Sequence, residues 1–134
     1  MPKTILRPAT LSFQPRPTIP YSPGAKGGQM IFTAGQVAWN EKGEVTGQGD
    51  VRLQPQQTLK NVISVLEEGG ATIKDVLKCN VYLANIEDFQ IMNEEFSRVF
   101  RDNPPARTTV EARLAEPTML VEIEAIAYIE LTGC

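Results

Sequence analysis

The sequence contains no histidine, and this absence removes several kinds of catalytic site from consideration. Ser-His-Asp and Cys-His systems both need an imidazole as the general base. A zinc site would have to rely on carboxylates and on the two cysteines, Cys79 and Cys134, which lie far apart and match no redox motif. We therefore expect no metal site, and acid–base chemistry must come from carboxylates, Tyr, Lys, Arg, backbone groups or water.

Long apolar runs are also missing. No segment approaches the roughly 20 apolar residues that a helix needs to span a bilayer. The start of the chain, Met1–Thr4, has no apolar signal core. Two cysteines without disulfide-like spacing fit a reducing compartment. The sequence therefore predicts a cytoplasmic protein with no membrane partner.

Clusters of basic residues are absent as well. The chain has 13 basic and 16 acidic residues and a net charge of −3, whereas a nucleic-acid binder normally carries a basic excess. We therefore expect no nucleic-acid partner. The 134 residues, 42% apolar and 22% charged, suffice for one core. Residues 1–134 are predicted to form a single domain that begins with a proline-rich segment, residues 1–20.

The first half of the chain predicts short strands followed by a helix. We expect a short strand at residues 4–6 and another at 30–34, and the Pro- and Gly-rich sequence between them indicates a loop or an edge segment. Residues 40–43 indicate a hairpin turn. A helix is predicted over residues 53–68 and ends at Gly69–Gly70. Its apolar residues recur at helical spacing: Leu59, Val62, Ile63 and Leu66.

The second half predicts a strand, a helix and two further strands. Residues 76–83 alternate in polarity, which places Leu77, Cys79, Val81 and Leu83 on one face. The following helix is expected to be capped by Asn85. Its predicted buried stripe consists of Phe89, Met92, Phe96, Val99 and Phe100. The last two strands are expected near residues 106–114 and 120–131.

These last two strands carry charged and polar side chains on alternate positions. Because their apolar residues would pack on the helices, Arg107, Thr109, Glu122 and Glu124 are expected to point away from the helices. The elements together predict an α+β fold, with a mixed or antiparallel sheet and two helices on one face. The opposite face would mix charged, aromatic and aliphatic side chains, which favours an interface between subunits.

The most informative pair of residues is Arg107 and Glu122. We expect them on neighbouring strands, about 4.8 Å apart, where they would flank one small pocket. An arginine fork can hold a substrate carboxylate with two charge-assisted hydrogen bonds. A carboxylate opposite it can orient or activate water. The alternative is a cross-strand ion pair with no role in binding. Glu124 is expected to be structural, in an ion pair with Arg113.

Several segments together resemble the RidA (YjgF-type) family of reactive enamine and imine deaminases. They are Pro20–Ser22, Ala34–Gln36, Asn61, Asn93, Pro105–Arg107 and Val121–Ala127. The resemblance implies a chorismate-mutase-like α+β fold. It also implies a homotrimer with a barrel-like centre and with sites in clefts between subunits.

The resemblance also assigns roles to individual residues. Arg107 matches the arginine that pairs with the substrate carboxylate, and Glu122 matches the acidic residue that places the attacking water. Tyr21 matches a tyrosine that lines the cleft from a neighbouring subunit. Gly35 matches a glycine whose backbone approaches the ligand, and Asn93 matches an asparagine near the site.

Two positions of the implied binding site depart from the family pattern. Ala34 stands where a serine is usual, so a hydrogen bond to the ligand is lost. Thr109 stands where a cysteine is frequent, but its backbone carbonyl, which can bind water, is retained. These changes leave the carboxylate anchor in place and affect the expected choice of substrate.

The resemblance therefore predicts hydrolysis of 2-iminoacids and their enamines, of the 2-aminoacrylate and 2-aminocrotonate type, to 2-ketoacids and ammonia. Such an enzyme limits damage by reactive metabolites. No cofactor is expected, because an imine is already electrophilic and positioning supplies much of the acceleration. Two alternatives stay open: a deaminase of a larger enamine such as 2-aminomuconate, and a non-catalytic trimer that binds small carboxylates and regulates a partner.

Overall fold

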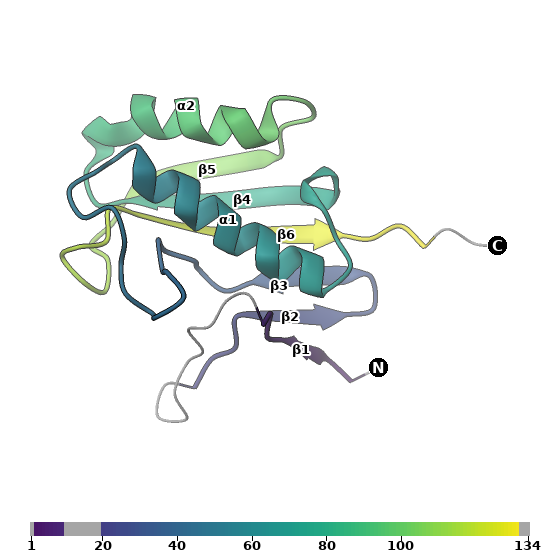
Figure 1. Cartoon of the computed structure of the whole chain (residues 1–134). Coiled ribbons are helices and arrows are strands. Elements are labelled where there is room, and N and C mark those ends of the chain that lie inside the picture. Colours follow the sequence, from purple (N-terminus) through teal and green to yellow (C-terminus); the bar gives the residue numbers. More distant parts are fainter. Residues whose placement is uncertain (1, 10–19, 132–134) are drawn as a thin grey trace.

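A six-stranded sheet carries both helices on one of its faces (Figure 1). The structure is a computed structural model, and it describes residues 2–9 and 20–131. The strands are β1 (Thr4–Leu6), β2 (Gly24–Gly27), β3 (Met30–Thr33), β4 (Val76–Leu83), β5 (Ala106–Glu111) and β6 (Val121–Tyr128). The helices are α1 (Leu53–Glu68) and α2 (Phe89–Phe100), with short 3₁₀ turns η1 (Ile73–Asp75) and η2 (Ile86–Asp88). The predicted α+β class, with two helices on one face of a mixed sheet, is confirmed.

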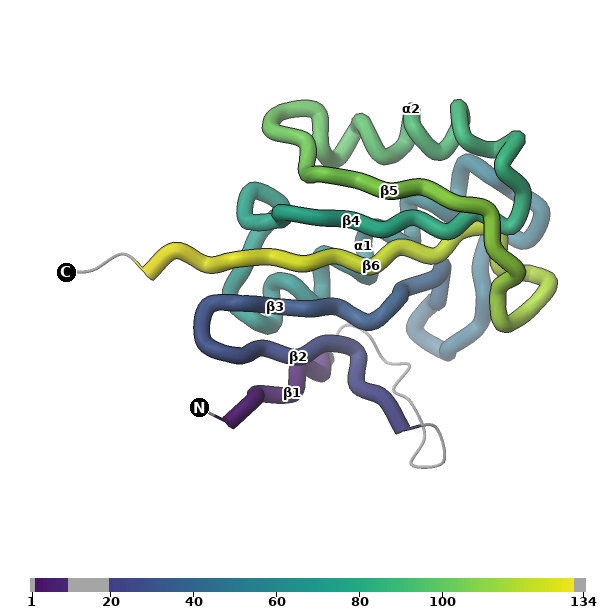
Figure 2. The backbone as a smooth tube through the Cα atoms, turned by 180° about the vertical axis from the view of Figure 1, so that it is seen from behind, coloured from purple at the N-terminus to yellow at the C-terminus, as the bar shows by residue number. Residues whose placement is uncertain are grey.

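The strand order is β1-β2-β3-β6-β4-β5, and Figure 2 shows the face that no helix covers. Strands β4 and β5 run parallel because α2 connects them as a crossover, whereas the other neighbouring strands are antiparallel. The expectation that β5 and β6 are neighbours is wrong. β4 lies between them, since the loop after β5 crosses the end of β4, where Leu83 and Ala84 bond to Ala112 and Leu120.

Helix α1 has the predicted bounds and three of the four residues of the predicted buried stripe; Ile63 is only partly buried, whereas Val65, which was not predicted, is buried. Leu59, Val62 and Leu66 are buried against the sheet. Pro55 stands in the first turn, where its missing N–H has no helical partner to lose. Gly70 has a φ of +89°, so the chain reverses there at the predicted stop.

Helix α2 follows the cap at Asn85 through the short turn η2, where the Asn85 side chain accepts from the Glu87 N–H. Two residues predicted for the core are exposed. Phe89, at the start of α2, is 39% exposed. Leu77 is 56% exposed because the β4–β6 register shifts between Val76 and Lys78, which turns Leu77 away from the core.

The N-terminal region contains β1 as predicted and a strand that the sequence did not indicate. β2 is short and glycine-rich, so its pattern carries little strand propensity, and it forms through pairing with β1 and β3. Residues 10–19 of the proline-rich segment, and Cys134, lie outside the described residues. No helix in the described part of the chain is both long enough and apolar enough to cross a bilayer.

Gln54 fixes the start of β6 to α1. Its side chain is fully buried, its Nε2 donates to the carbonyls of Thr118 (2.7 Å) and Gly47 (3.3 Å), and its Oε1 accepts from the Leu120 N–H (2.8 Å). All the hydrogen-bonding groups of a buried amide are thereby used. The loop that leads into β6 is consequently held in one position, and Glu122 follows directly after it.

Candidate active site

Arg107 lies on the edge strand β5 beneath α2. Its Nη2 donates to Oδ1 of Asn93 at 2.5 Å. The guanidinium carbon lies 4.8 Å from the ring centroid of Phe96 and 5.6 Å from that of Phe89. Contacts of a cation with aromatic ring faces hold the guanidinium and also leave its edge available for hydrogen bonds.

The expectation that Arg107 and Thr109 point away from the helices is wrong. Arg107 stands opposite Cys79 in the β4–β5 register, and Cys79 is fully buried under the helices. Thr108, the intervening residue, faces the uncovered side, where its hydroxyl accepts from Lys78 Nζ at 2.7 Å. The inward set of β5 is the more polar of the two, so the alternation of polarity pointed to the wrong face; on this edge strand the Arg107 guanidinium packs against the Phe89 and Phe96 rings instead.

The guanidinium of Arg107 is not neutralised by the described part of its own chain. Asn93 is its one hydrogen-bond partner there, and it makes no salt bridge. Burial lowers the pKa of Arg107, but an arginine stays cationic in proteins. An open cavity of about 470 Å³ lies beside it, lined by Asn93, Phe96, Ser97, Phe100, Arg101, Pro104, Pro105 and Arg107.

Two further groups near Arg107 are buried. The Thr109 hydroxyl is buried and has no hydrogen-bond partner among the described residues. The Cys79 thiol is a free thiol, and burial raises its pKa to about 12, so Cys79 is not a nucleophile near neutral pH.

Glu122 lies on the opposite, uncovered face of the sheet. Its neighbours Val121 and Ile123 are buried under the helices, so the alternation of β6 turns Glu122 outward, where it stands opposite Tyr82 of β4. Burial, and then the charge of Glu124, raise the pKa of Glu122. A carboxyl with a raised pKa takes up a proton more readily from a neighbouring water.

Tyr21 and Gly35 lie on the same side as Glu122 of their own chain. Burial, and then the charge of Glu122, raise the pKa of Tyr21, which is 44% exposed. A methyl group added at Gly35 would overlap the Glu122 carboxylate, so only glycine fits that position without displacing it.

Gly35 reaches Glu122 because the β3–β6 ladder is interrupted at Ala34. Phe32 pairs with Ile126 and Gln36 pairs with Ile123, so four steps on one strand oppose three on the other. The Thr33 hydroxyl accepts from the Ala125 N–H at 3.0 Å in place of a ladder bond. Ala34 donates its N–H to the carbonyl of Pro23 at 2.8 Å. This bulge brings the Ala34–Gly35 backbone to the uncovered face.

Glu124 does not pair with Arg113. The Tyr82 hydroxyl donates to Oε1 of Glu124 at 2.6 Å, and Asn80 Nδ2 donates to the same oxygen at 3.2 Å. The bonds from Tyr82 and Asn80 to Glu124 were not predicted from the sequence, and neither were the contacts of Phe89 and Phe96 with Arg107. The signal that could have found Tyr82 and Asn80 is the alternation of β4, which places them on the face of Glu124.

The structure thus separates the predicted site residues into two groups. Arg107, Asn93 and Thr109 lie between β5 and α2, whereas Glu122, Gly35 and Tyr21 lie on the uncovered face with Ala34 nearby. Because β4 lies between β5 and β6, the alternative of an Arg107–Glu122 ion pair is also wrong for the described chain. Each group supplies half of the predicted site.

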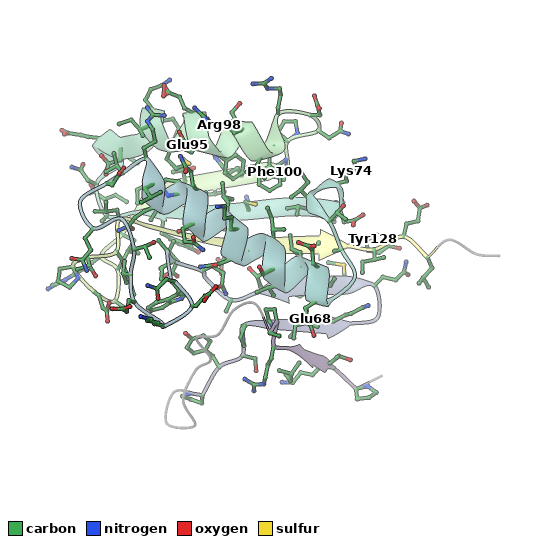
Figure 3. The ribbon with its side chains drawn as sticks, viewed as in Figure 1. Glu68, Lys74, Glu95, Arg98, Phe100 and Tyr128 are labelled. Carbon is green, nitrogen blue, oxygen red and sulfur yellow. The ribbon has the colours of Figure 1, made fainter. Side chains whose placement is uncertain are left out.

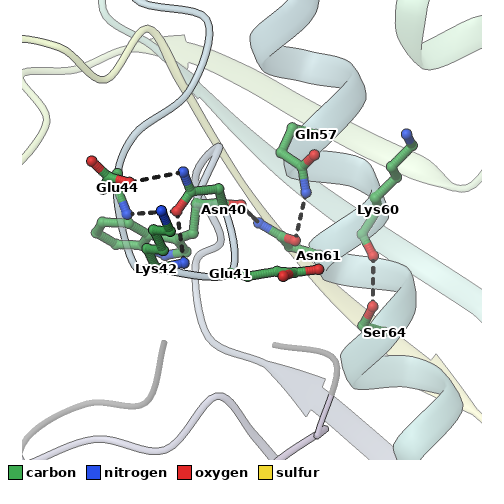
Figure 4. A pocket seen from close by; sticks show the side chains of 9 residues that line it. Asn40, Glu41, Lys42, Glu44, Gln57, Lys60, Asn61 and Ser64 are labelled. Carbon is green, nitrogen blue, oxygen red and sulfur yellow. Dashed lines mark hydrogen bonds between the residues drawn. The ribbon is translucent and has the colours of Figure 1, made fainter. Parts of the chain in front are cut away.

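A second cavity, of about 460 Å³, lies between the 39–44 hairpin and α1 (Figure 4). Its polar side chains mostly bond to one another or to backbone: Asn40 Nδ2 donates to Glu44 (3.3 Å), and Gln57 Nε2 donates to Asn61 (3.0 Å). Asn61 Nδ2 in turn donates to the carbonyls of Val37 and Trp39. These bonds hold the hairpin on the helix, and none of the predicted catalytic residues lies in this cavity.

Comparison with known proteins gives consistent matches along the chain. A family model described as Endoribonuclease L-PSP matches residues 12–129. A RutC family protein of Pyrococcus abyssi is 43% identical over 117 residues, which cover 87% of this chain and 91% of the relative. A 2-iminobutanoate/2-iminopropanoate deaminase of Dermatophagoides farinae is 34% identical over 116 residues, 87% of this chain and 91% of the relative. The crystal structure of E. coli TdcF with bound serine matches with a TM-score of 0.82 and 28% identity, covering 95% of this chain and 99% of that one.

The topology and these matches define a small α+β protein with the YjgF-like, chorismate-mutase-like fold. The chain belongs to the Rid family (YjgF/YER057c/UK114), whose family model covers most of its length. The family resemblance expected from the sequence is therefore confirmed.

Proposed function

We propose that this protein hydrolyses reactive 2-iminoacids and their enamine tautomers to 2-ketoacids and ammonia. The observation that carries the proposal is a guanidinium held by Asn93 and two phenylalanine rings, beside an open cavity and without a carboxylate partner in the described chain. Such an arrangement suits a ligand that brings its own carboxylate. We also propose that the protein is cytoplasmic and that residues 1–134 form one domain.

The complete site is formed between two copies of the chain. Arg107 and Glu122 occupy opposite faces of one sheet, so a small molecule cannot contact both within a single copy. The uncovered face also exposes Phe32, Val110 and Tyr128, which is unusual for a surface that stays in water. These observations support the homotrimer implied by the family, with three sites between subunits.

The chemistry requires positioning of the imine and of one water molecule. Arg107 of one copy holds the substrate carboxylate, and Glu122 of the next copy holds a water near the imine carbon together with a backbone carbonyl. The reacting imine carries a proton from solvent on its nitrogen. As the water oxygen bonds to the carbon, the C=N electron pair moves to the nitrogen and Glu122 takes one proton from the water, which gives a neutral carbinolamine. Glu122 then returns this proton to the nitrogen, and the C–N bond breaks as the hydroxyl oxygen forms the carbonyl and gives up its proton to Glu122 or to solvent, so that ammonia and the 2-ketoacid are released.

The backbone of Gly35 supplies a further contact. Its N–H has no hydrogen-bond partner within the described residues, and the Glu122 carboxylate occupies the space where a side chain at this position would lie. An N–H in this position can donate to the ligand, which is the role that the resemblance implies. The mite relative is an iminobutanoate and iminopropanoate deaminase, and TdcF binds serine, an amino acid with a carboxylate of the same kind.

The test is the decay of 2-aminoacrylate or 2-iminobutanoate generated in situ, followed spectroscopically. Arg107→Ala should lower kcat/KM by about 10²–10⁴-fold, since two charge-assisted hydrogen bonds to the carboxylate are lost. Arg113→Ala is the matched control, because it removes one exposed positive charge from the loop after β5. No acceleration by the wild-type protein, or equal rates for wild type and Arg107→Ala, would reject the proposal.

The same measurements separate the alternatives. Turnover of 2-aminomuconate without turnover of small imines would favour the deaminase of a larger enamine. Calorimetric binding of 2-ketoacids with no turnover of any imine would favour the non-catalytic regulator. The family model carries the description of an endoribonuclease. We nevertheless expect no RNA binding at any salt concentration, because the net charge is −3.

A further inference from the structure

Glu124 lies close to the proposed water-holding residue and takes no part in the steps above. Glu122 and Glu124 are two residues apart on β6, so their side chains leave the same face about 7 Å apart. Two groups of the neighbouring strand β4 donate to a single oxygen of Glu124: the Tyr82 hydroxyl at 2.6 Å and the Asn80 amide at 3.2 Å. The Glu124 carboxylate is therefore fixed in place next to the Glu122 carboxylate.

We propose that Glu124, held by Tyr82 and Asn80, is a positioning residue whose charge makes the Glu122 carboxylate a stronger acceptor of a proton from water. The catalytic part of this inference rests on the proposed imine hydrolysis, whereas the coupling between the two carboxylates does not.

The physical basis is repulsion between like charges at short range. When Glu124 is ionised, a second negative charge on Glu122 is disfavoured, so Glu122 binds a proton more strongly. The half-buried environment of Glu122 acts in the same direction and limits screening by solvent. A base that binds a proton more strongly removes one from water more readily.

No cation of the described chain offsets this repulsion. The groups that face Glu122 are Tyr21 from the segment before β2, the backbone of Gly35, Tyr82 from β4 and Glu124 itself. Lys78 also lies on this face of β4, but its ammonium donates to Thr108 of β5, on the side away from β6. In the proposed assembly, the guanidinium of a neighbouring copy approaches only with the substrate carboxylate that it binds.

Tyr82 is suited to hold Glu124 at all working pH values. Its backbone stands opposite Glu122, and its hydroxyl reaches diagonally to Glu124, so its side chain lies beside both carboxylates. The hydrogen bond to Glu124 and burial raise the pKa of Tyr82 to about 12, so the hydroxyl keeps its proton and remains a donor. Both donors use one oxygen of Glu124, which fixes the distance between the two carboxylates.

The experiment titrates the side-chain carboxyl carbon of Glu122 by ¹³C NMR in the assembled protein, with the signal assigned by its loss in Glu122→Gln. Glu124→Gln should move the midpoint of Glu122 down by about 0.5–1 pH unit. Glu68→Gln, at the exposed end of α1 on the other side of the sheet (Figure 3), removes the same charge and should leave the midpoint unchanged. An unchanged midpoint in Glu124→Gln overturns the inference.

Tyr82→Phe tests whether Tyr82 acts through Glu124. It should shift the Glu122 midpoint in the wild-type background and produce no shift in the Glu124→Gln background, because the group through which it acts is then neutral. Equal shifts in both backgrounds, or none in either, overturn the role of Tyr82. Thermal melting of each variant confirms that it is folded.

Activity then separates this inference from the proposed function. The acid limb of kcat/KM against pH should move down in Glu124→Gln by the same amount as the NMR midpoint. A moving NMR midpoint in a protein with no imine turnover would reject the proposed function and leave the carboxylate coupling standing. If the NMR midpoint of Glu122 shifts in Glu124→Gln but the acid limb of kcat/KM does not, the catalytic part of the inference is rejected.

Discussion

Two side chains of opposite charge, Arg107 and Glu122, are each half-buried without an ion-pair partner in the described chain. Burying an unpaired charge lowers stability, so such residues are retained where function needs them. For Glu122, the direction in which stability changes with pH follows from its pKa. Its pKa is raised in the folded state, so the folded protein binds more protons than the unfolded chain, and stability falls as the pH rises through this range.

Glu122→Gln should therefore stabilise the protein at neutral pH and abolish imine hydrolysis. The neutral amide has nearly the same shape and avoids the penalty for burying a charge, so we expect Tm to rise by about 2–4 °C at pH 7. The difference from wild type should shrink below about pH 4, where the glutamate is protonated. Melting curves from pH 4 to 8 measure this, and a lower Tm at pH 7 would contradict it.

The types of these residues were predictable from the sequence, but their orientations were not. Arg107 and Glu122 in β-like segments indicated an anion site and a water site. The direction of Arg107 depends on its register with Cys79, which is a contact between distant parts of the chain. Phe96 and Asn93 hold the guanidinium from α2, and that arrangement follows from packing rather than from local pattern.

At the level of elements, the bulge at Ala34–Gly35 connects the fold to the site. Gly35→Ala should displace the Glu122 carboxylate and lower kcat/KM by about 10²-fold or more, since a misplacement of about 1 Å has effects of that size. Gly27→Ala is the matched control, because an added methyl group there meets no other atom. Steady-state kinetics on both folded variants measure the effect, and equal activities would contradict the placement of Glu122.

The contact between α1 and α2 depends on Glu95, whose carboxylate is buried (Figure 3). Arg52 Nη1 donates to it at 2.6 Å and Gln56 Nε2 at 2.9 Å. Burial alone would raise the pKa of Glu95, but these hydrogen bonds together with the charges of Arg98 and Arg52 outweigh burial, and the pKa is lowered. The resulting stability is present above the unfolded pKa of about 4.3 and is lost as the pH falls below it.

Glu95→Gln should accordingly lower Tm by about 4 °C at pH 7 and have little effect near pH 3. Glu94→Gln provides the control, because Glu94 pairs with the same Arg52 at 3.1 Å but is half-exposed, and such pairs contribute little. Melting curves against pH distinguish the two variants. A loss in Glu95→Gln that is independent of pH would show that the carboxylate charge is not responsible.

The sequence predicted the elements better than their order in the sheet. Apolar periodicity located α1, α2 and β4 within a few residues, because each has a strong repeating pattern. β2 was missed because GAKG has no such pattern. The predicted position of β5, next to β6, was wrong because the prediction assumed that the short loop between them joins neighbouring strands, as such loops normally do. Here the crossover through α2 had already placed β5 beside the outer edge of β4.

At the level of the whole molecule, the two halves of the proposed site face opposite sides of one sheet. A closed ring of identical copies can bring the Arg107 side of one copy to the Glu122 side of the next. This explains why neither residue needs a partner of opposite charge within its own chain. Because the two halves of a site come from different copies, Arg107 can be mutated in one copy and Glu122 in another.

The most direct test of this account is subunit complementation between Arg107→Ala and Glu122→Gln, unfolded together and reassembled in equal amounts. Each variant alone has every site damaged, whereas random mixing leaves about one quarter of the sites with both residues intact. We predict that the mixture recovers about one quarter of wild-type imine hydrolysis, while each variant refolded alone stays inactive. A mixture as inactive as its components, with mixed oligomers confirmed by mass spectrometry, would contradict a site shared between copies.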